Sequence, residues 1–364
     1  GGLKQQAPRS APQSTGTSQP MHRPRMALRN VLLSTGLILA RGVNHTEIGD
    51  CESLVQLEET KLAGDVYVST AHSLEDLMYT AVLHRTMKDH HPMHNHIIQI
   101  RKDSPLSKRA HAIRVAMAQG WWNVQLEVFK PESLNMESVS LAAWRQYAPL
   151  SFRRESYHRV TYLSSDMVAT TNFDRVIHKP YAFIAARNQG DCKNLTEALA
   201  TTKPSNVVLS IVPDDGVLTW LTSSGTRLFS EGTMNSAPDA PLRKLDTAGV
   251  MSLAYEKMHP AMQSGAYTAS EVMSLNCLMH HKDAALKERG ADAASLIHLG
   301  AEGKKMIAEI IEKGENRLKN TISGLEAAGR KQMANALTLW FHAYNRVDVK
   351  GVLDAAKNGV LAEK

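Results

Sequence analysis

Segments typical of strands alternate with segments typical of helices between residues 66 and 163, and this alternation constrains the fold most strongly. Residues 66–70 are mostly β-branched or aromatic, as in a buried strand, and residues 74–87 repeat apolar side chains at helical spacing. A second strand-like run covers residues 97–100. The same alternation continues with a helix at 105–120, a strand at 124–129, a helix at 136–147 and a strand at 159–163. It predicts an α/β domain with a mostly parallel, doubly wound, Rossmann-like sheet.

The remainder of the chain is predicted to be mainly helical. From about Gly249 onward there are few strand candidates, and residues 304–325 carry apolar side chains along one face, which predicts a single amphipathic helix. Residues 337–344 form a second apolar segment, typical of core or interface packing. No glycine-rich phosphate loop follows residues 66–70, which disfavours a dinucleotide-binding domain.

The positive charge of the chain is concentrated at its N-terminus. Lysine and arginine number 42 against 36 aspartates and glutamates, but six of the basic residues precede Glu47, the first acidic one. The rest of the chain is therefore close to neutral, and a nucleic-acid partner is not expected. Residues 1–24 are rich in Pro, Ser, Gln and Gly, so we expect a protein partner to order this arm.

Residues 25–42 are basic, apolar and free of acidic residues, which is typical of organelle-targeting segments. They predict a mitochondrial location, with the secretory-pathway lumen as the alternative. The apolar run 31–40 is about half as long as a spanning helix needs to be, so membrane contact remains open but a span is not expected.

Cysteines and histidines give no clear sign of a metal site. Cys51, Cys192 and Cys277 lie far apart without a CxxC pair, which favours a reducing compartment, or simply inert buried thiols, over a zinc site or a disulfide framework. The histidines of residues 90–96 lack a closed set of four ligands. A solvated or interface loop is the simpler interpretation of that segment.

One segment resembles a known enzyme family. Residues 159–174 run from a hydrophobic strand through Ser164-Ser165-Asp166 and a short apolar stretch to Asn172-Phe173-Asp174. This resembles the signature of the retaining glycosyltransferases that include glycogenin and galactinol synthase, where Asp-x-Asp takes the place of Ser-Ser-Asp. Weaker matches follow in the family's order at residues 66–73, 192–194, 203–205, 230–235 and 298–304, so that the resemblance covers about two thirds of the chain.

The resemblance implies a GT-A fold and a site for a UDP-sugar with a divalent cation, usually manganese. Asp166 and His298 correspond to metal ligands. The donor-binding positions correspond to Val68, Ser69, Thr70 and Lys304. Three positions that carry the family's chemistry hold Ser164, Ser230 and Asn194 here, and the family's donor-binding lysine falls near Ala148. Because serine cannot supply an anionic ligand, these departures predict weak cation binding and a degenerate active site.

These observations lead to one functional hypothesis and one alternative. The leading hypothesis is a catalytically degenerate, glycosyltransferase-like structural subunit of a large mitochondrial assembly, with other protein subunits as partners and no cofactor. The alternative is an active transferase that uses manganese and moves a hexose from a UDP-sugar to an acceptor. The expected organisation is a basic arm at 1–46, a GT-A domain at 47–300 and a helical extension at 301–364.

Overall fold

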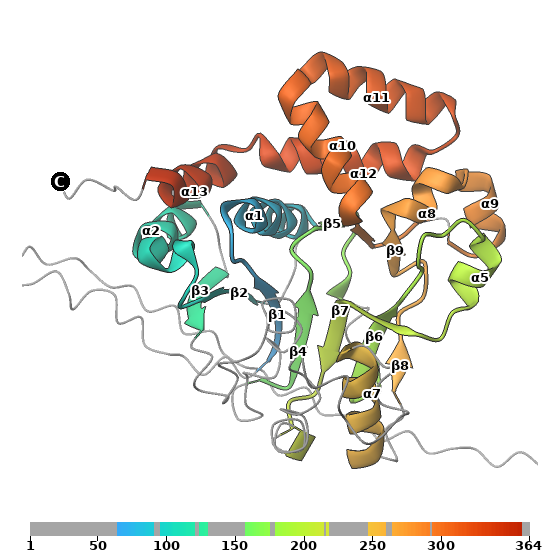
Figure 1. The fold of residues 1–364 in the computed structure, drawn as a ribbon, viewed down its shortest axis with the longest axis horizontal. Coiled ribbons are helices and arrows are strands. Elements are labelled where there is room, and N and C mark those ends of the chain that lie inside the picture. Colours follow the sequence, from blue (N-terminus) through green and yellow to red (C-terminus); the bar gives the residue numbers. More distant parts are fainter. Residues whose placement is uncertain are drawn as a thin grey trace, which may run out of the picture. The chain divides into compact units, whose positions relative to one another are not determined.

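The computed structural model shows an α/β fold with a helical C-terminal part (Figure 1). The structure describes residues 64–90, 95–120, 124–129, 157–174, 179–214, 216–217, 247–259, 264–291 and 293–358. Residues 58–364 form one compact unit. The predicted arm, the helix at 136–147, and residues Ala148 and Ser230 lie outside the described residues, as do parts of the histidine segment.

A seven-stranded sheet forms the centre of the molecule, in the order β3-β2-β1-β4-β7-β6-β8. The bounds of its strands are β1 Asp65–Thr70, β2 Asn95–Arg101, β3 Val124–Phe129, β4 Arg159–Leu163, β6 Phe183–Arg187, β7 Pro204–Ile211 and β8 Gly265–Ala266. Of these seven, β7 alone runs against the others, because it pairs antiparallel with both of its neighbours. The prediction of a mostly parallel sheet is therefore confirmed.

The strand order reverses direction between β1 and β4, which are parallel neighbours. From β1 the chain proceeds to β2 and β3 on one side, and later returns to β4 on the other. In open α/β sheets, the crevice beyond the carboxyl ends of such a strand pair is the usual place for ligands. The residues that follow Thr70 and Leu163 are therefore the ones to inspect first.

A small second sheet lies at that end, with strands in the order β5-β10-β9. Its strands are β5 Met167–Ala169, β9 Val272–Ser274 and β10 Leu296–His298. β10 pairs antiparallel with β5 and parallel with β9. The chain thus passes from the central strand β4 into the small sheet within four residues.

Helices pack on the central sheet and on one another. Helix α1, Leu74–Asp89, follows β1 and begins with a capping box, in which Ser73 and Asp76 each bind the other's backbone N–H. The other helices near the sheet are η1 Pro105–Arg109, α2 Ala110–Gly120, α5 Leu195–Ala200, α7 Thr247–Met258, α8 Leu275–His280 and α9 Asp283–Glu288. Helix α2 contacts β3, and α7 contacts β6 and β7.

Four consecutive helices end the described chain: α10 Gly300–Lys313, α11 Glu315–Ala327, α12 Lys331–Tyr344 and α13 Val347–Asn358. Helix α12 packs on α1, and α13 packs on both α1 and α2, as Figure 1 shows. One cluster of buried side chains joins these helices to the sheet domain, with Leu77 of α1, Ile113 of α2, Trp340 of α12 and Val352 of α13 among its members. The boundary at 300/301 stays a prediction.

The prediction of one helix at 304–325 is wrong. Gly314 separates α10 from α11 with a φ of 77°, a backbone conformation that favours glycine because it has no Cβ. The apolar spacing of the segment continued across the break, so periodicity alone could not reveal it. Strands β6 and β7 were not predicted either, although both carry a largely buried apolar stretch.

The expectation of free thiols is also wrong, because Cys192 and Cys277 form a disulfide. Their Cα atoms are 5.0 Å apart although 85 positions separate them in the sequence. Cys192 adopts a φ of 56° in the turn before α5, and His281, just after α8, bonds the Cys192 carbonyl oxygen at 2.7 Å. Sequence spacing could not indicate this pair, since the fold alone brings the two segments together.

Candidate functional site

Asp166 lies three residues beyond the end of β4, at the carboxyl end of the parallel strands. The small sheet brings His298 to it, because His298 pairs with Met167, the residue after Asp166, across the β5–β10 ladder. A backbone hydrogen bond from Leu299 N to Asp166 O at 2.9 Å extends this pairing. Lys304 follows one turn into α10 and reaches the same carboxylate. Three of the sequence-predicted site residues are therefore brought together.

Both oxygens of the Asp166 carboxylate contact polar groups of the chain. Oδ1 accepts a hydrogen bond from Ser164 Oγ at 2.5 Å and lies 3.4 Å from His298 Nε2. Oδ2 lies 3.1 Å from Lys304 Nζ. The Asp166 side chain is only 8% exposed. An internal ammonium group thus neutralises the one carboxylate of this cluster.

The pKa of Asp166 is lowered below its usual range. Burial acts in the opposite direction, but the hydrogen bond and charge of His298, the charge of Lys304 and the hydrogen bond from Ser164 outweigh it. Asp166 is therefore ionised at neutral pH. Its buried negative charge is stabilised by His298, Lys304 and Ser164.

Lys304 also contacts α1, and so links three elements. Its Nζ atom lies 5.2 Å from the centre of the Tyr79 ring, within the range of a cation–π interaction. The Lys304 side chain is 32% exposed. Burial, followed by the charges of Glu75 and Asp166, raises the pKa of the Tyr79 hydroxyl, which stays neutral at physiological pH.

The residues of this cluster do not fit a divalent cation well. Manganese and magnesium prefer several oxygen ligands with negative charge, whereas this cluster offers one carboxylate that an ammonium already contacts. Ser164 donates to the carboxylate instead of adding a second anionic ligand. Within the described part of the chain, no group of three histidine, cysteine, aspartate or glutamate side chains is placed to hold a metal ion.

The predicted donor-binding residues of β1 lie in the protein interior. Val68 and Ser69 are fully buried and Thr70 is 1% exposed. Ser69 Oγ donates to the carbonyl oxygen of Leu163 at 2.9 Å, which joins the carboxyl ends of β1 and β4. Their assignment to donor binding stays a prediction. The assignment of Asn194 to a position that carries the family's chemistry also stays a prediction; in the structure Asn194 caps the N-terminus of α5 by accepting a hydrogen bond from Glu197 N.

A chain of buried polar groups next to this site was not predicted. Ser69 donates to Leu163 O, so its oxygen accepts from His96 Nε2 at 3.0 Å. The Nδ1 atoms of His84 and His96 lie 3.2 Å apart, which requires His84 to donate and His96 to accept if both rings are neutral. Their rings stack at 5.3 Å. His96 is 1% exposed within β2, so the expectation of a solvated loop is wrong for this residue.

Burial lowers the pKa of both imidazoles. That of His96 falls to about 3, and that of His84 is lowered by burial and by the charges of His96, Lys88 and Arg85. Both rings are therefore neutral in the folded protein near pH 7, which agrees with the donor and acceptor roles deduced above. β2 is buried at every position between its two ends, so only the apolar run that follows His96 in the sequence could have signalled that this residue also lies in the core.

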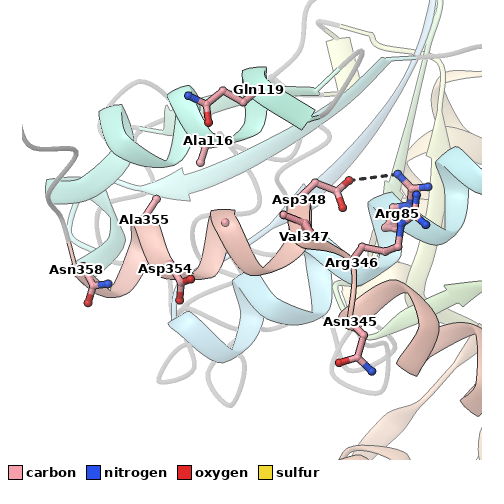
Figure 2. A pocket seen from close by; sticks show the side chains of 11 residues that line it. Arg85, Ala116, Gln119, Asn345, Arg346, Val347, Asp348, Asp354, Ala355 and Asn358 are labelled. Atoms are coloured by element: carbon pink, nitrogen blue, oxygen red, sulfur yellow. Dashed lines mark hydrogen bonds and ion pairs between the residues drawn. The ribbon is translucent and has the colours of Figure 1, made fainter. Parts of the chain in front are cut away.

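Two hollows lie along the C-terminal helix, and none of their lining residues belongs to the Asp166 cluster. One of about 850 Å³ opens between α1, α2 and α13 (Figure 2). Arg85 of α1 lines it and bonds Asp89 at 2.6 Å and Asp348 of α13 at 3.2 Å. The pair with Asp348, drawn dashed in Figure 2, ties α13 to α1. The charges around this hollow are of both signs, and it indicates no ligand class.

None of the described helices is both long enough and apolar enough to span a membrane.

Comparisons with known proteins give partial structural likenesses. No protein-family model matches the chain, and no curated protein matches it. The bifunctional glycosyltransferase WbbM matches 66% of this chain at 14% identity and a TM-score of 0.40. Mouse xyloside xylosyltransferase 1 matches 66% of this chain at 8% identity and a TM-score of 0.39. The galactosyltransferase LgtC matches 65% of this chain at 12% identity and a TM-score of 0.38. The matches cover 46%, 98% and 86% of those chains, so this chain spans less than half of the WbbM structure.

Proposed function

We propose that this protein is a catalytically degenerate, glycosyltransferase-like chain that serves as a structural subunit of a larger assembly. The observation that carries the proposal is the state of Asp166. Its two carboxylate oxygens contact Ser164, His298 and Lys304, and Lys304 supplies the positive charge that a metal ion would otherwise bring. A diphosphate leaving group is stabilised by positive charge that it can contact directly. Here the positive charge of Lys304 is already paired with Asp166 inside the protein.

The disulfide supports a location in an oxidising compartment. Such bonds persist in secreted and luminal proteins and are rare where thiols are kept reduced. Both cysteines are buried, at 2% and 0% exposure, so the bond joins interior segments of the fold. We propose the secretory-pathway lumen in place of the mitochondrial matrix, with the protein assembly located there.

The alternative function, a manganese-dependent hexosyltransferase that uses a UDP-sugar, is favoured by one observation. Asp166 and His298, from segments more than a hundred residues apart in sequence, lie within 3.4 Å of each other. Such a pair would be two ligands of a cation if Lys304 turned away. The two functions differ in what manganese does to the purified protein.

Thermal denaturation and calorimetry with manganese, UDP and UDP-glucose test the proposal. We expect no manganese-dependent rise in melting temperature at millimolar ligand, because a ligand that binds the native state must stabilise it. Ser164→Asp, which adds a second carboxylate beside Asp166, should gain manganese binding, whereas the neutral Ser164→Asn should not. A manganese-dependent shift of the unmodified protein with UDP would favour the alternative.

The proposed assembly has its own test. A tagged chain expressed in its native cells should migrate in native gels well above its monomer mass of 40.1 kDa. Migration as the monomer alone would contradict a structural subunit, whatever the outcome of the metal titration.

A further inference from the structure

A basic cleft lies where the C-terminal end of α13 meets the turns after β1 and β2. It has a volume of about 860 Å³, within the range of small-molecule sites. Its lining residues include His72 of the first turn, Lys102 of the second, Lys108 and Arg109 of η1, and Lys357 of α13. None of its lining residues belongs to the cluster around Asp166. The cleft is therefore a separate feature, to which the C-terminal helix contributes.

The positive charge of this cleft is not cancelled by its own acidic residue. Asp103 lines the cleft, but Arg101 binds both of its oxygens, at 2.8 Å and 2.6 Å. The hydrogen bond from Arg101 lowers the pKa of Asp103, so the carboxylate is ionised and its charge is matched by Arg101. The basic residues of the cleft are therefore not needed to neutralise Asp103.

The hydrogen-bond partners of Arg109 in the described structure are neutral backbone groups. Its Nη1 atom donates to the backbone carbonyl oxygens of Ala356 and Lys357, at the end of α13. Lys108 and Lys357 are exposed, and among the described residues no carboxylate lies within ion-pair distance of either. Lys108 of η1 and Lys357 of α13 thus bring positive charge to the cleft without a carboxylate partner among the described residues.

The wall formed by the first turn is held in place and carries an unsatisfied polar atom. Asp76 accepts hydrogen bonds from the backbone N–H groups of His72 and Ser73, both at 3.2 Å, and Ser104 Oγ donates to His72 O at 2.6 Å. The buried Nδ1 atom of His72 has no hydrogen-bond partner within the described structure. A buried polar atom without a partner is uncommon in folded proteins and calls for one.

We propose that this cleft binds a small phosphate-bearing molecule. Phosphate oxygens accept several charge-assisted hydrogen bonds, which suits the ammonium groups of Lys108 and Lys357 and the N–H groups of Arg109. The cleft lies beyond the carboxyl ends of β1 and β2, the end of the sheet at which ligands of α/β domains bind. Free pyrophosphate and a phosphorylated sugar share this chemistry, and the experiment separates them.

Calorimetry of the full chain in low-salt buffer tests this site, with pyrophosphate and glucose 6-phosphate as separate probes and no metal present. We expect binding of at least one probe, and the tighter one identifies the source of the phosphate. Lys108→Glu/Lys357→Glu should weaken binding by about tenfold or more, equivalent to ~1.4 kcal/mol. Lys287→Glu/Lys305→Glu is the matched control, because it makes the same change in net charge at exposed positions of α9 and α10.

The outcomes separate the proposal from nonspecific attraction. Retained affinity in the control, within about threefold, together with its loss in the cleft variant supports the site. Equal losses of affinity in the two variants would show a general effect of net charge and would overturn the proposed site. The absence of binding by both probes would overturn it as well. Because this titration contains no metal and the proposed function is tested with manganese, failure here and failure of the proposed function can be told apart.

Discussion

The side chains around Asp166 determine whether this carboxylate is free to bind a cation. Sequence reasoning named Asp166, His298 and Lys304 from a resemblance, and the structure brings all three together. It could not say that Lys304 contacts the carboxylate and the Tyr79 ring at once, because that depends on where α10 begins. The residues of the site could be named from the sequence, whereas the atoms that each of them contacts could not.

Lys304→Met should destabilise the protein at pH 7 by about 1–2 kcal/mol, since the buried Asp166 loses one of the positive charges that compensate it, while Lys304 itself is partly exposed. A carboxylate with a lowered pKa stabilises the fold above its unfolded pKa, and this contribution disappears as the pH falls through the folded pKa. The gap between variant and unmodified protein should therefore narrow below about pH 4. Urea denaturation across pH measures it, with Lys304→Arg as the control that keeps the charge.

The two buried imidazoles predict sensitivity to mild acid. Both have lowered pKa values and are neutral in the fold, so only the unfolded chain binds their protons as the pH drops below about 6.5. Each histidine should then cost ~1.4 kcal/mol of stability per pH unit below that point. His96→Gln should reduce the slope of stability against pH by about half, although it lowers stability at pH 7. An unchanged slope would contradict this explanation.

Helices and strands with a clear apolar pattern were predicted well. Features that depend on backbone conformation or on neighbouring strands were predicted poorly. The strands at β1, β2 and β4 and the helix α1 were predicted from period and composition. The break at Gly314 was missed because it changes the backbone direction without interrupting the apolar spacing. β7 could not be predicted as antiparallel, since orientation is set by neighbouring strands and not by its own residues.

Two glycines of this helical region give a matched test of that break. A Cβ atom at Gly314 or at Gly324 would meet nothing within 4 Å, so backbone conformation is the only difference. Gly314→Ala should destabilise by about 1 kcal/mol or more, because its φ is positive. Gly324→Ala, inside α11, should stabilise by about 0.5–1 kcal/mol. Chemical denaturation compares the two, and equal effects would refute the role given to Gly314.

The whole molecule combines a sheet domain, a helical C-terminal part and one long-range covalent link. Fold class followed from the sequence because alternation of strands and helices admits few architectures. The disulfide did not, because its cysteines meet only when the turn before α5 is positioned against α8. The sequence also could not predict that α12 and α13 pack into one core with α1 and α2. An amphipathic pattern shows which face of a helix is buried but not which element covers it.

Reduction should weaken the whole fold. A link across 85 positions restricts the unfolded chain, and its loss should cost about 3–4 kcal/mol and lower the melting temperature. Cys192→Ser/Cys277→Ser should melt lower than the unmodified protein and should not respond to a reducing agent. If the unmodified protein melts at the same temperature with and without the reductant, the bond contributes nothing to stability.

The link between Cys192 and Cys277 also makes a closed ring of the chain between them. A protease that cuts once anywhere inside that ring cannot separate the two halves, because the sulfur–sulfur bond still holds them. β7, α7 and β9, the strand of the small sheet that precedes α8, belong to this covalently closed stretch. A nicked molecule would keep its full mass on a gel without reductant and fall into two fragments with it.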